Sequence, residues 1–589
     1  MRLHRLALVR LAAATLVLGG AARAPAQAQA QDDAIIQALL DGRDGDIGGL
    51  IASHANVNAV DDAGATALAL AVSEGNTPVV AALLKAHADP NLADANGVTP
   101  LFVAVENGSA ALVGTLLDNR AKPDATRSNG ETPLMVAVRG GSVDIVRLLL
   151  ARKAPVNARE NEFGQTALMM AAGQPAIMQL LLDHGADVGA RTKSWEVKNV
   201  VYTPATGTLG LTGIPWNNDG TFTGKMGGTT ALLFAAQKGD VAGARLLIAA
   251  GADVNEAAAD GTTPLLAALY RWEVPAGRPA DTVAPMIARP LGGLTFASSY
   301  VLANLLLDKG AKVDVADRGG YTPLHGALVN LVDPAMIAFQ SSENGPRRRS
   351  SYVPPPGVLA AGRATIARLL DAGADPNRAT LHPTPGPVGN VRVNPAPPGS
   401  TPLHVAAQVN APGLVEMLLA HGGNPNLVRK DGQTPFSVAA QVSNLLALKA
   451  MVAGGADLRM IYNPTEEVAD PVLSKAEARR HVTVLHIAAV AGADKVIEYL
   501  AAAGVPLDVV DDHGETAAQL ADNQERFRLA KATEGYLNNG TEGKQKPVRS
   551  TRMTDAFRRA AQGGIAVAQT GAGDGRGNGV SGSLANRNR

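Results

Sequence analysis

The stretch 400-STPLHVAAQV-409 decides the fold of this chain, because its central phrase recurs along most of the sequence. Threonines that open a complete or degraded Thr-Pro-Leu phrase stand at positions 66, 99, 132, 166, 230, 263, 322, 401, 434, 483 and 516. Six of the ten intervals between these threonines are 33 or 34 residues long. A fixed period of this length indicates stacked copies of one small unit rather than independent globular domains.

Particular residue types recur at fixed positions before and after each threonine. A glycine such as Gly97, Gly130 or Gly432 stands two residues before, with His481 as the one exception, and an alanine stands five residues after. Glycine is expected where a tight turn needs a positive φ. Threonine caps a helix that opens at proline, whose missing N–H is no loss in the first turn. The alanine is small enough for successive inner helices to lie close together.

A second helix is predicted to follow the first within each period. Pairs of apolar residues, such as Val79 and Val80 followed by Leu83 and Leu84, recur at helical spacing. The helix ends at a phrase such as 251-GADVN-255, where glycine suits a left-handed C-terminal cap. Each period therefore predicts two helices and a turn that projects like a finger.

This order, with T-P-L-H in front and L-L-x-x-G-A-D-x-N behind, closely resembles the ankyrin repeat. The resemblance covers about residues 32–540. It implies an all-α solenoid of about eleven fingers, with an N-terminal cap near Asp33–Asn58 and a polar closing cap near 523–537. It also implies binding of other proteins, through a concave face built from inner helices and fingers.

Histidine occupies the third position after threonine at His325, His404 and His486. In the ankyrin family this histidine is structural, and its ring hydrogen-bonds to the backbone of adjoining fingers. The resemblance implies the same role here, since a side chain at this position faces a neighbouring repeat. Three such residues in different repeats do not converge on one metal ion.

No motif predicts a catalytic, metal or cofactor site. The chain has no cysteine, which excludes disulfides and thiolate ligands, and it has no H-E-x-x-H, G-x-S-x-G or G-x-x-x-x-G-K-[ST]. We therefore expect a non-catalytic scaffold. The alternative is an envelope enzyme or enzyme inhibitor whose functional residues lie in the insertions described next.

The long intervals place irregular insertions in the array, near residues 189–226, 271–298, 331–362, 378–398 and 459–480. The first, fourth and fifth are expected to leave the array at its finger end. The second and third fall between the paired helices, at the opposite end. Individual loops on a regular scaffold are expected to carry specificity.

Large aromatic residues gather at these insertions although packing of the repeats does not require them there. Those that we consider candidates for partner binding are Trp195, Tyr202, Trp216, Phe222, Tyr270, Trp272 and Tyr352, accompanied by Phe296 and Tyr300. They suit anchors for a protein partner. They equally suit small local cores that hold the insertions onto the array.

Residues 1–31 have the pattern of a secretory signal peptide. Arg2, Arg5 and Arg10 precede an apolar run, from Leu11 to Leu18, that is too short to span a bilayer, and small residues allow cleavage near Ala28 or Ala30. The chain is similar to exported bacterial ankyrin-repeat proteins. A periplasmic or secreted location is therefore expected, with another exported or envelope protein as partner.

Charge divides the chain into an acidic body and a basic tail. Once residues 1–31 are removed, acidic residues outnumber basic ones, which argues against a nucleic-acid partner. Residues 541–589 hold nine Lys or Arg against three Asp or Glu and end in a Gly-rich stretch. We expect a flexible tail there, with a weak contact to an anionic surface left open, and no transmembrane segment anywhere.

Overall fold

The computed structural model describes residues 34–197, 224–269, 296–331, 356–381, 399–463, 480–525 and 550–570. The described chain is mostly helical, and its helices come in pairs, which confirms the predicted repeat array. It divides into two compact units. The N-terminal unit holds the described residues up to 269 and also 301–312, and the C-terminal unit holds 296–300 and the described residues from Val313 onward.

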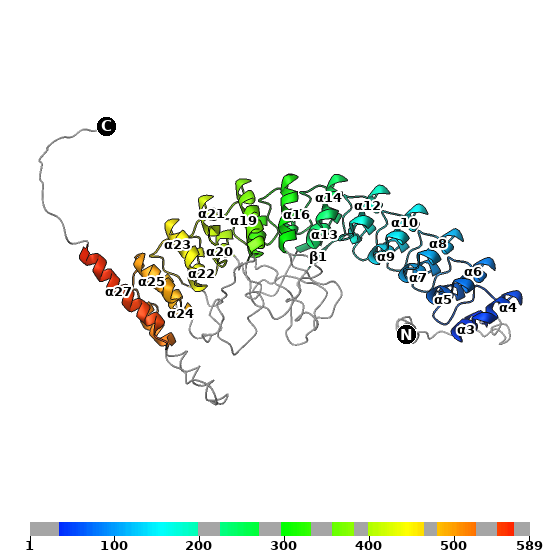
Figure 1. Ribbon diagram of the computed structural model, residues 1–589, viewed down its shortest axis with the longest axis horizontal. Coiled ribbons are helices and arrows are strands. Elements are labelled where there is room, and N and C mark those ends of the chain that lie inside the picture. Colours follow the sequence, from blue (N-terminus) through cyan, green and yellow to red (C-terminus); the bar gives the residue numbers. More distant parts are fainter. Residues whose placement is uncertain are drawn as a thin grey trace, which may run out of the picture. The chain divides into compact units, whose positions relative to one another are not determined.

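In the N-terminal unit, helix pairs follow one another along the chain (Figure 1). The elements are α3 (Ala34–Leu40), η1 (Asp44–Asp46), α4 (Ile47–Ala52), α5 (Ala67–Ser73), α6 (Thr77–Lys85), α7 (Pro100–Glu106), α8 (Ala110–Asp118), α9 (Pro133–Arg139), α10 (Val143–Ala151), α11 (Ala167–Met170), α12 (Pro175–Asp183), β1 (Ser194–Val197), β2 (Gly224–Gly227), α13 (Ala231–Lys238), α14 (Val241–Ala249) and α15 (Pro264–Leu269). Helix α16 (Phe296–Asp308) has residues in both units.

The C-terminal unit continues the same alternation of inner and outer helices. Its elements are α17 (Pro323–Val329), α19 (Pro356–Asp371), α20 (Pro402–Ala406), α21 (Leu414–Ala420), α22 (Pro435–Gln441), α23 (Leu445–Ala453), α24 (Val484–Ala491), α25 (Asp494–Ala502) and α27 (Arg552–Thr570). Residues 517–525 are also helical.

Each inner helix from α5 onward begins directly after the recurring threonine. In α9, for example, Thr132 is the N-cap and its Oγ1 accepts the N–H of Met135 at 3.3 Å, while Pro133 occupies the first turn. Five residues after threonine, the alanine is at most 1% exposed in all eleven repeats. A larger side chain there would push neighbouring inner helices apart.

A finger is the loop between the outer helix of one repeat and the threonine of the next. In the finger of Thr99, the N–H of Asp94 donates to the carbonyl of Val98 at 3.1 Å, and Oδ1 of Asp94 accepts the N–H of Val98. Gly97 has φ +80°, and a Cβ on it would lie 2.8 Å from the carbonyl oxygen of Thr126 in the next finger. This close approach requires glycine.

Asparagine side chains join successive repeats. Oδ1 of Asn91 accepts the N–H of Lys122 at 2.8 Å, and its Nδ2 donates to the carbonyl of Arg120 at 3.1 Å. The backbone adds another link, because the N–H of Ser128 donates to the carbonyl of Asn96 one finger away. Each repeat is thus bonded to its neighbour as well as packed against it.

At three insertions, the hydrogen bond that closes an ordinary finger is kept at the base of the inserted chain. Thr192, Thr380 and Tyr462 stand where Asp94 stands in its finger, and their N–H groups donate to the carbonyls of Thr229, Ser400 and Val482 at 3.0, 2.9 and 2.8 Å. Each acceptor directly precedes the threonine of its repeat, as Val98 does. The inserted chain therefore starts at a finger tip, and the bond at its base keeps the spacing of the repeats.

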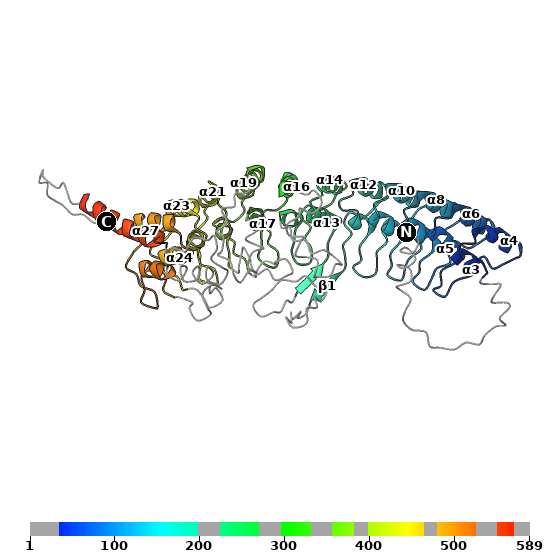
Figure 2. The ribbon, with the colours of Figure 1, turned by 60° about the horizontal axis from the view of Figure 1, so that its bottom comes forward.

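The first insertion has a feature that the sequence did not predict, a two-stranded antiparallel sheet. Strands β1 and β2 pair from Ser194 with Gly227 to Val197 with Gly224. In Figure 2, β1 lies at the finger edge of the N-terminal unit, and the outer helices α6, α8, α10 and α12 lie along the opposite edge.

The two insertions between paired helices are shorter than expected, because part of each lengthens an outer helix. Helices α16 and α19 have 13 and 16 residues, against nine in α10. The third insertion therefore ends before Pro356 rather than at residue 362. Gly362 is buried within α19, where a Cβ would lie 3.0 Å from the hydroxyl of Tyr300.

The expectation of a flexible tail from Thr541 is wrong for residues 552–570. They form α27, which packs on α25 and buries Met553, Ala556 and Phe557. Apolar residues at this helical spacing form a stripe that a neighbouring helix can cover.

The expected signal peptide, most of the closing cap and the Gly-rich end lie outside the described residues. No described helix is both long enough and apolar enough to cross a membrane.

Candidate interaction surface

An exposed aromatic pair marks the finger end of the N-terminal unit. The rings of Phe163, in the finger of Thr166, and Trp195, in β1, lie with centroids 5.8 Å apart and planes tilted by 59°. The two residues remain 38% and 40% exposed. Large rings that are packed on one side and open on the other suit contact with a protein partner.

The backbone under this pair is held in place by short contacts. The N–H of Lys193 donates to the carbonyl of Phe163 at 2.7 Å, which joins the two fingers. The ring of Trp195 lies over Gly227, where a Cβ would come within 2.7 Å of it. Arg191 links this base to the next finger, since its Nη1 donates to the carbonyls of Gly228 and Ala257 at 2.9 Å.

The other aromatic candidates divide between the core and the parts of the chain that the structure does not describe. Tyr300 belongs to the core, since it is fully buried and its hydroxyl donates to the carbonyl of Ala327 at 2.9 Å. Tyr300 thus packs between helices of the array and is not exposed to a partner. The candidates outside the described residues are Tyr202, Trp216, Phe222, Tyr270, Trp272 and Tyr352.

Phe163 was not among the residues proposed from the sequence. A signal was present, because the interval from Thr132 to Thr166 is 34 residues and not 33. The additional residue lengthens this finger, whose closing bond runs from the N–H of Glu160 to the carbonyl of Gln165. Both oxygens of the Glu160 carboxylate accept backbone N–H groups inside the turn and shape its tip.

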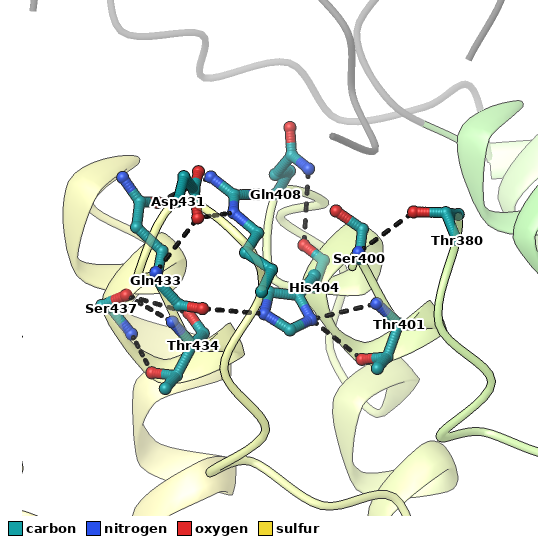
Figure 3. Close-up of polar contacts among 10 residues, drawn as sticks. Thr380, Ser400, Thr401, His404, Gln408, Asp431, Gln433, Thr434 and Ser437 are labelled. Carbon is teal, nitrogen blue, oxygen red and sulfur yellow. Dashed lines mark hydrogen bonds and ion pairs between the residues drawn. The ribbon is translucent and has the colours of Figure 1, made fainter. Parts of the chain in front are cut away.

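The three histidines of the phrase lie in the C-terminal unit and link repeats. Nδ1 of His404 accepts the N–H of its own Thr401 at 3.1 Å, and Nε2 faces the carbonyl of Gln433, in the next finger, at 3.3 Å (Figure 3). His325 and His486 make the same pair of contacts, with the carbonyls of Ser400 and Glu515. A backbone donor at Nδ1 and a carbonyl at Nε2 define a neutral ring with its proton on Nε2.

Burial keeps two of these rings neutral. Desolvation lowers the pKa of His325 to about 4 and that of His404 to about 3, and the nearby positive charge of Arg429 adds to the effect at His404. Arg429 is itself buried, and its Nε and Nη2 donate to Asp431 and to the side chain of Gln433. Both ring nitrogens of His404 are thus engaged in structural bonds.

One cluster among the described residues has the composition of a metal site, namely Asp511, Asp512 and His513. Asp511 is buried, and its Oδ1 already accepts the N–H groups of His513 and Glu515, as the aspartate does in other fingers. The cluster is a finger turn with two exposed neighbours. We assign no ligand to it.

Together these features define a class of protein. Helix pairs stacked by nearest-neighbour contacts form a solenoid whose fingers present side chains, and this architecture is a scaffold for protein–protein interaction.

Comparison with known families supports the same class. Ankyrin repeats (3 copies) match residues 27–127 and 111–192, a single ankyrin repeat matches 227–258, and ankyrin repeats (many copies) match 393–439. The matched stretches are ankyrin repeats, and the paired helices of the described residues form an ankyrin-repeat array. Proteins of this kind are typically non-catalytic, and a non-catalytic role for this chain stays a prediction.

Similar proteins share the repeats over part of their length. Ankyrin repeat and SOCS box protein 16 of Homo sapiens is 29% identical over 229 residues, which are 37% of this chain and 41% of that protein. The BTB/POZ domain and ankyrin repeat-containing protein NPR5 of Oryza sativa subsp. japonica is 39% identical over 93 residues, 16% of this chain and 15% of that protein. The chain spans less than half the length of either relative.

Proposed function

We propose that this chain is exported and binds another exported protein in the envelope of a bacterial cell. Its concave face and the insertions at the finger end form the binding surface. The pair of Phe163 and Trp195 is the observation that carries the proposal, because it combines exposure with a fixed position. Anchors of this kind bind well when little conformational entropy is lost.

The base of the first insertion supports a role in recognition. The β1–β2 ladder pairs Val197 with Gly224, the two residues that flank residues 198–223, and the contacts of Arg191 hold the base of this ladder. Chain that starts from a fixed base can vary without disturbing the repeats beneath it. Residues 198–223 would then select the partner while Trp195 anchors it.

Export rests on the pattern of residues 1–31, with cleavage near Ala28 or Ala30. Cell fractionation with mass measurement of the mature N-terminus tests this part independently of binding. A mature chain that begins within a few residues of Ala30 and is found outside the cytoplasm is expected. A cytoplasmic chain that retains residues 1–31 would overturn the location but not the surface.

The surface is tested by affinity capture from an envelope extract, followed by mass spectrometry. In the decisive variant, Trp195→Ala in the full chain, recovery of the captured protein should fall at least about tenfold, as for an interface hot spot. The fold should be retained, because the side chain is 40% exposed. Equal recovery with wild type and variant would overturn the anchor.

A matched pair of deletions separates recognition from folding. The first removes residues 198–223 and joins β1 to β2 through an Asn-Gly turn. The second removes 464–479 above the Tyr462–Val482 bridge, which leaves an equivalent closing bond. We expect unchanged helical content in both and loss of capture in the first alone. Loss of capture in the second alone would assign recognition to the C-terminal unit.

A further inference from the structure

The end of the C-terminal unit carries a helix that is not a repeat. Residues 526–549 separate α27 from residues 517–525, yet α27 packs on α25, the outer helix of the last complete repeat. The outer helices of inner repeats, such as α10, lie between the outer helices of the repeats before and after them. Helix α27 therefore covers the flank of α25 that another repeat would otherwise cover.

The contact combines a short apolar stripe with charges. Met553, Ala556 and Phe557 are buried. At the edges, Nη2 of Arg552 lies 2.7 Å from Oδ2 of Asp494, and Nε of Arg559 lies 2.8 Å from Oε1 of Glu498. These two carboxylates stand one turn apart on α25, and the arginines stand two turns apart on α27.

A buried carboxylate accepts hydrogen bonds from the first turn of α27. Glu525 is 2% exposed, and its Oε1 accepts the N–H of Met553 at 2.7 Å, while its Oε2 accepts the hydroxyl of Thr554. A negative charge beside the first N–H groups of a helix is favourable. The receiving surface thus recognises three features of a helix, namely its N-terminus, its apolar stripe and its arginines.

Among the described residues, α27 is attached from one side. Among the described elements α27 contacts α25 and Glu525, whereas α10 contacts α8, α9 and α12. The ion pairs at its edges are partly exposed to solvent and are weakened by salt. A terminal element with neighbours on one side opens at lower free energy than the array that it covers.

We propose that the surface formed by Asp494, Glu498 and Glu525 with the flank of α25 that α27 covers is a receptor for a basic amphipathic helix. Helix α27 is its resident ligand and detaches when a partner helix competes. The partner carries apolar residues with the spacing of Met553, Ala556 and Phe557, between two arginines seven positions apart. This inference does not depend on the proposed finger-end surface.

A labelled peptide of residues 550–570 tests the receptor by fluorescence anisotropy with full-length protein. In the variant Arg552→Glu with Arg559→Glu, the tethered helix repels α25 and leaves the surface free. The peptide should bind this variant at least about tenfold more tightly than wild type, because tethered α27 no longer competes. Hydrogen exchange should show lost protection at 553–557 and unchanged protection at 402–441.

A charge-reversed control restores the resident helix. Adding Asp494→Lys and Glu498→Lys to that variant re-forms opposite charges, so protection of 553–557 should return and binding of the wild-type peptide should disappear. Should charge reversal unfold the unit, Phe557→Ala in the full chain provides a milder route to the same release. Equal peptide binding to wild type and released variants, or no binding to a folded chain whose α27 is unprotected, would overturn the receptor.

Discussion

The two units differ at one position of the same repeat, the third residue after threonine. In the N-terminal unit this residue is apolar and buried, at Ala69, Phe102, Met135, Met169, Leu233 and Leu266. In the C-terminal unit it is polar, and its side chain accepts the backbone N–H of the repeat's threonine, at His325, His404, Ser437, His486 and Gln519. The same helix pair is thus stabilised in two ways.

Both an apolar and a polar residue at this position can link a repeat to the next finger. Phe102 does so with its ring face, 4.6 Å from the guanidinium carbon of Arg127. His404 does so through the carbonyl of Gln433. Packing tolerates changes of shape at modest cost, whereas a buried hydrogen bond depends on the protonation and identity of its partners. The C-terminal unit should therefore be the more sensitive to pH and to substitution.

The largest expected effect is a pH-dependent loss of stability confined to the C-terminal unit. The folded pKa values of His325 and His404 lie below that of a histidine in the unfolded chain, near 6.5, so the unfolded state binds more protons as the pH falls. Their stabilisation is complete above pH 6.5 and is lost as the pH falls to about 4 for His325 and to about 3 for His404. At about 1.4 kcal/mol per pH unit and histidine, the two together cost roughly 4 kcal/mol by pH 5.

Urea unfolding followed unit by unit with hydrogen exchange measures this difference between pH 7.5 and pH 5. The N-terminal unit provides the reference. Burial raises the pKa of Glu131 there, but hydrogen bonds from Arg139 and Asn129 and the positive charges of Arg139 and Arg127 together lower it below its usual range. The stabilisation by Glu131 is therefore lost only as the pH falls below the ordinary pKa of a glutamate, outside this window. Parallel loss of stability in both units over this window would contradict the comparison.

A smaller loss of stability is expected from replacing the third residue after threonine by leucine in each unit. His404→Leu leaves the N–H of Thr401 without its acceptor and removes one bond from the carbonyl of Gln433. We expect a loss of roughly 3 kcal/mol for the C-terminal unit. The matched change Met135→Leu conserves shape in the N-terminal unit and should cost below about 1.5 kcal/mol. Denaturant titration at pH 7.5 compares them, and equal costs would remove the distinction.

The smallest difference between the two units is expected for the alanine five residues after threonine, where a larger side chain should cost the same stability in both. Ala406→Leu and Ala137→Leu each place a larger side chain between neighbouring inner helices, where the native alanine is buried. We expect each to cost about 1 to 3 kcal/mol through overpacking. Melting curves that change for one substitution and not for the other would show that the inner helices pack differently in the two units.

Local chemistry explains what the sequence predicted well. Thr132 and Pro133 specify a helix start through their own backbone, and Gly97 specifies a turn through its positive φ. Such features recur at a fixed period, so each copy supports the interpretation of the others. Even the exception follows the rule, because His481 adopts the left-handed conformation of the missing glycine, with φ +58°.

What the sequence did not predict depends on residues far apart in the chain. Helix α27 is defined by its contacts with Asp494, Glu498 and Glu525, and Gly-rich sequence after it favoured a flexible segment. The exposed pair requires Phe163 and Trp195 to meet across two fingers, one of them lengthened by a residue. Strands as short as β1 and β2 leave too little alternation to be detected.

The comparison is tested most directly by nitrogen NMR of the histidine rings in the full-length chain, titrated from pH 7.5 to pH 5. His421 supplies an internal reference, since hydrogen bonds to the carbonyl of Met417 and to Asp371 raise its pKa. The account predicts that His325 and His404 stay neutral with the proton on Nε2 throughout, while His421 becomes charged. Titration of His325 and His404 near pH 6.5 would contradict the buried link between repeats.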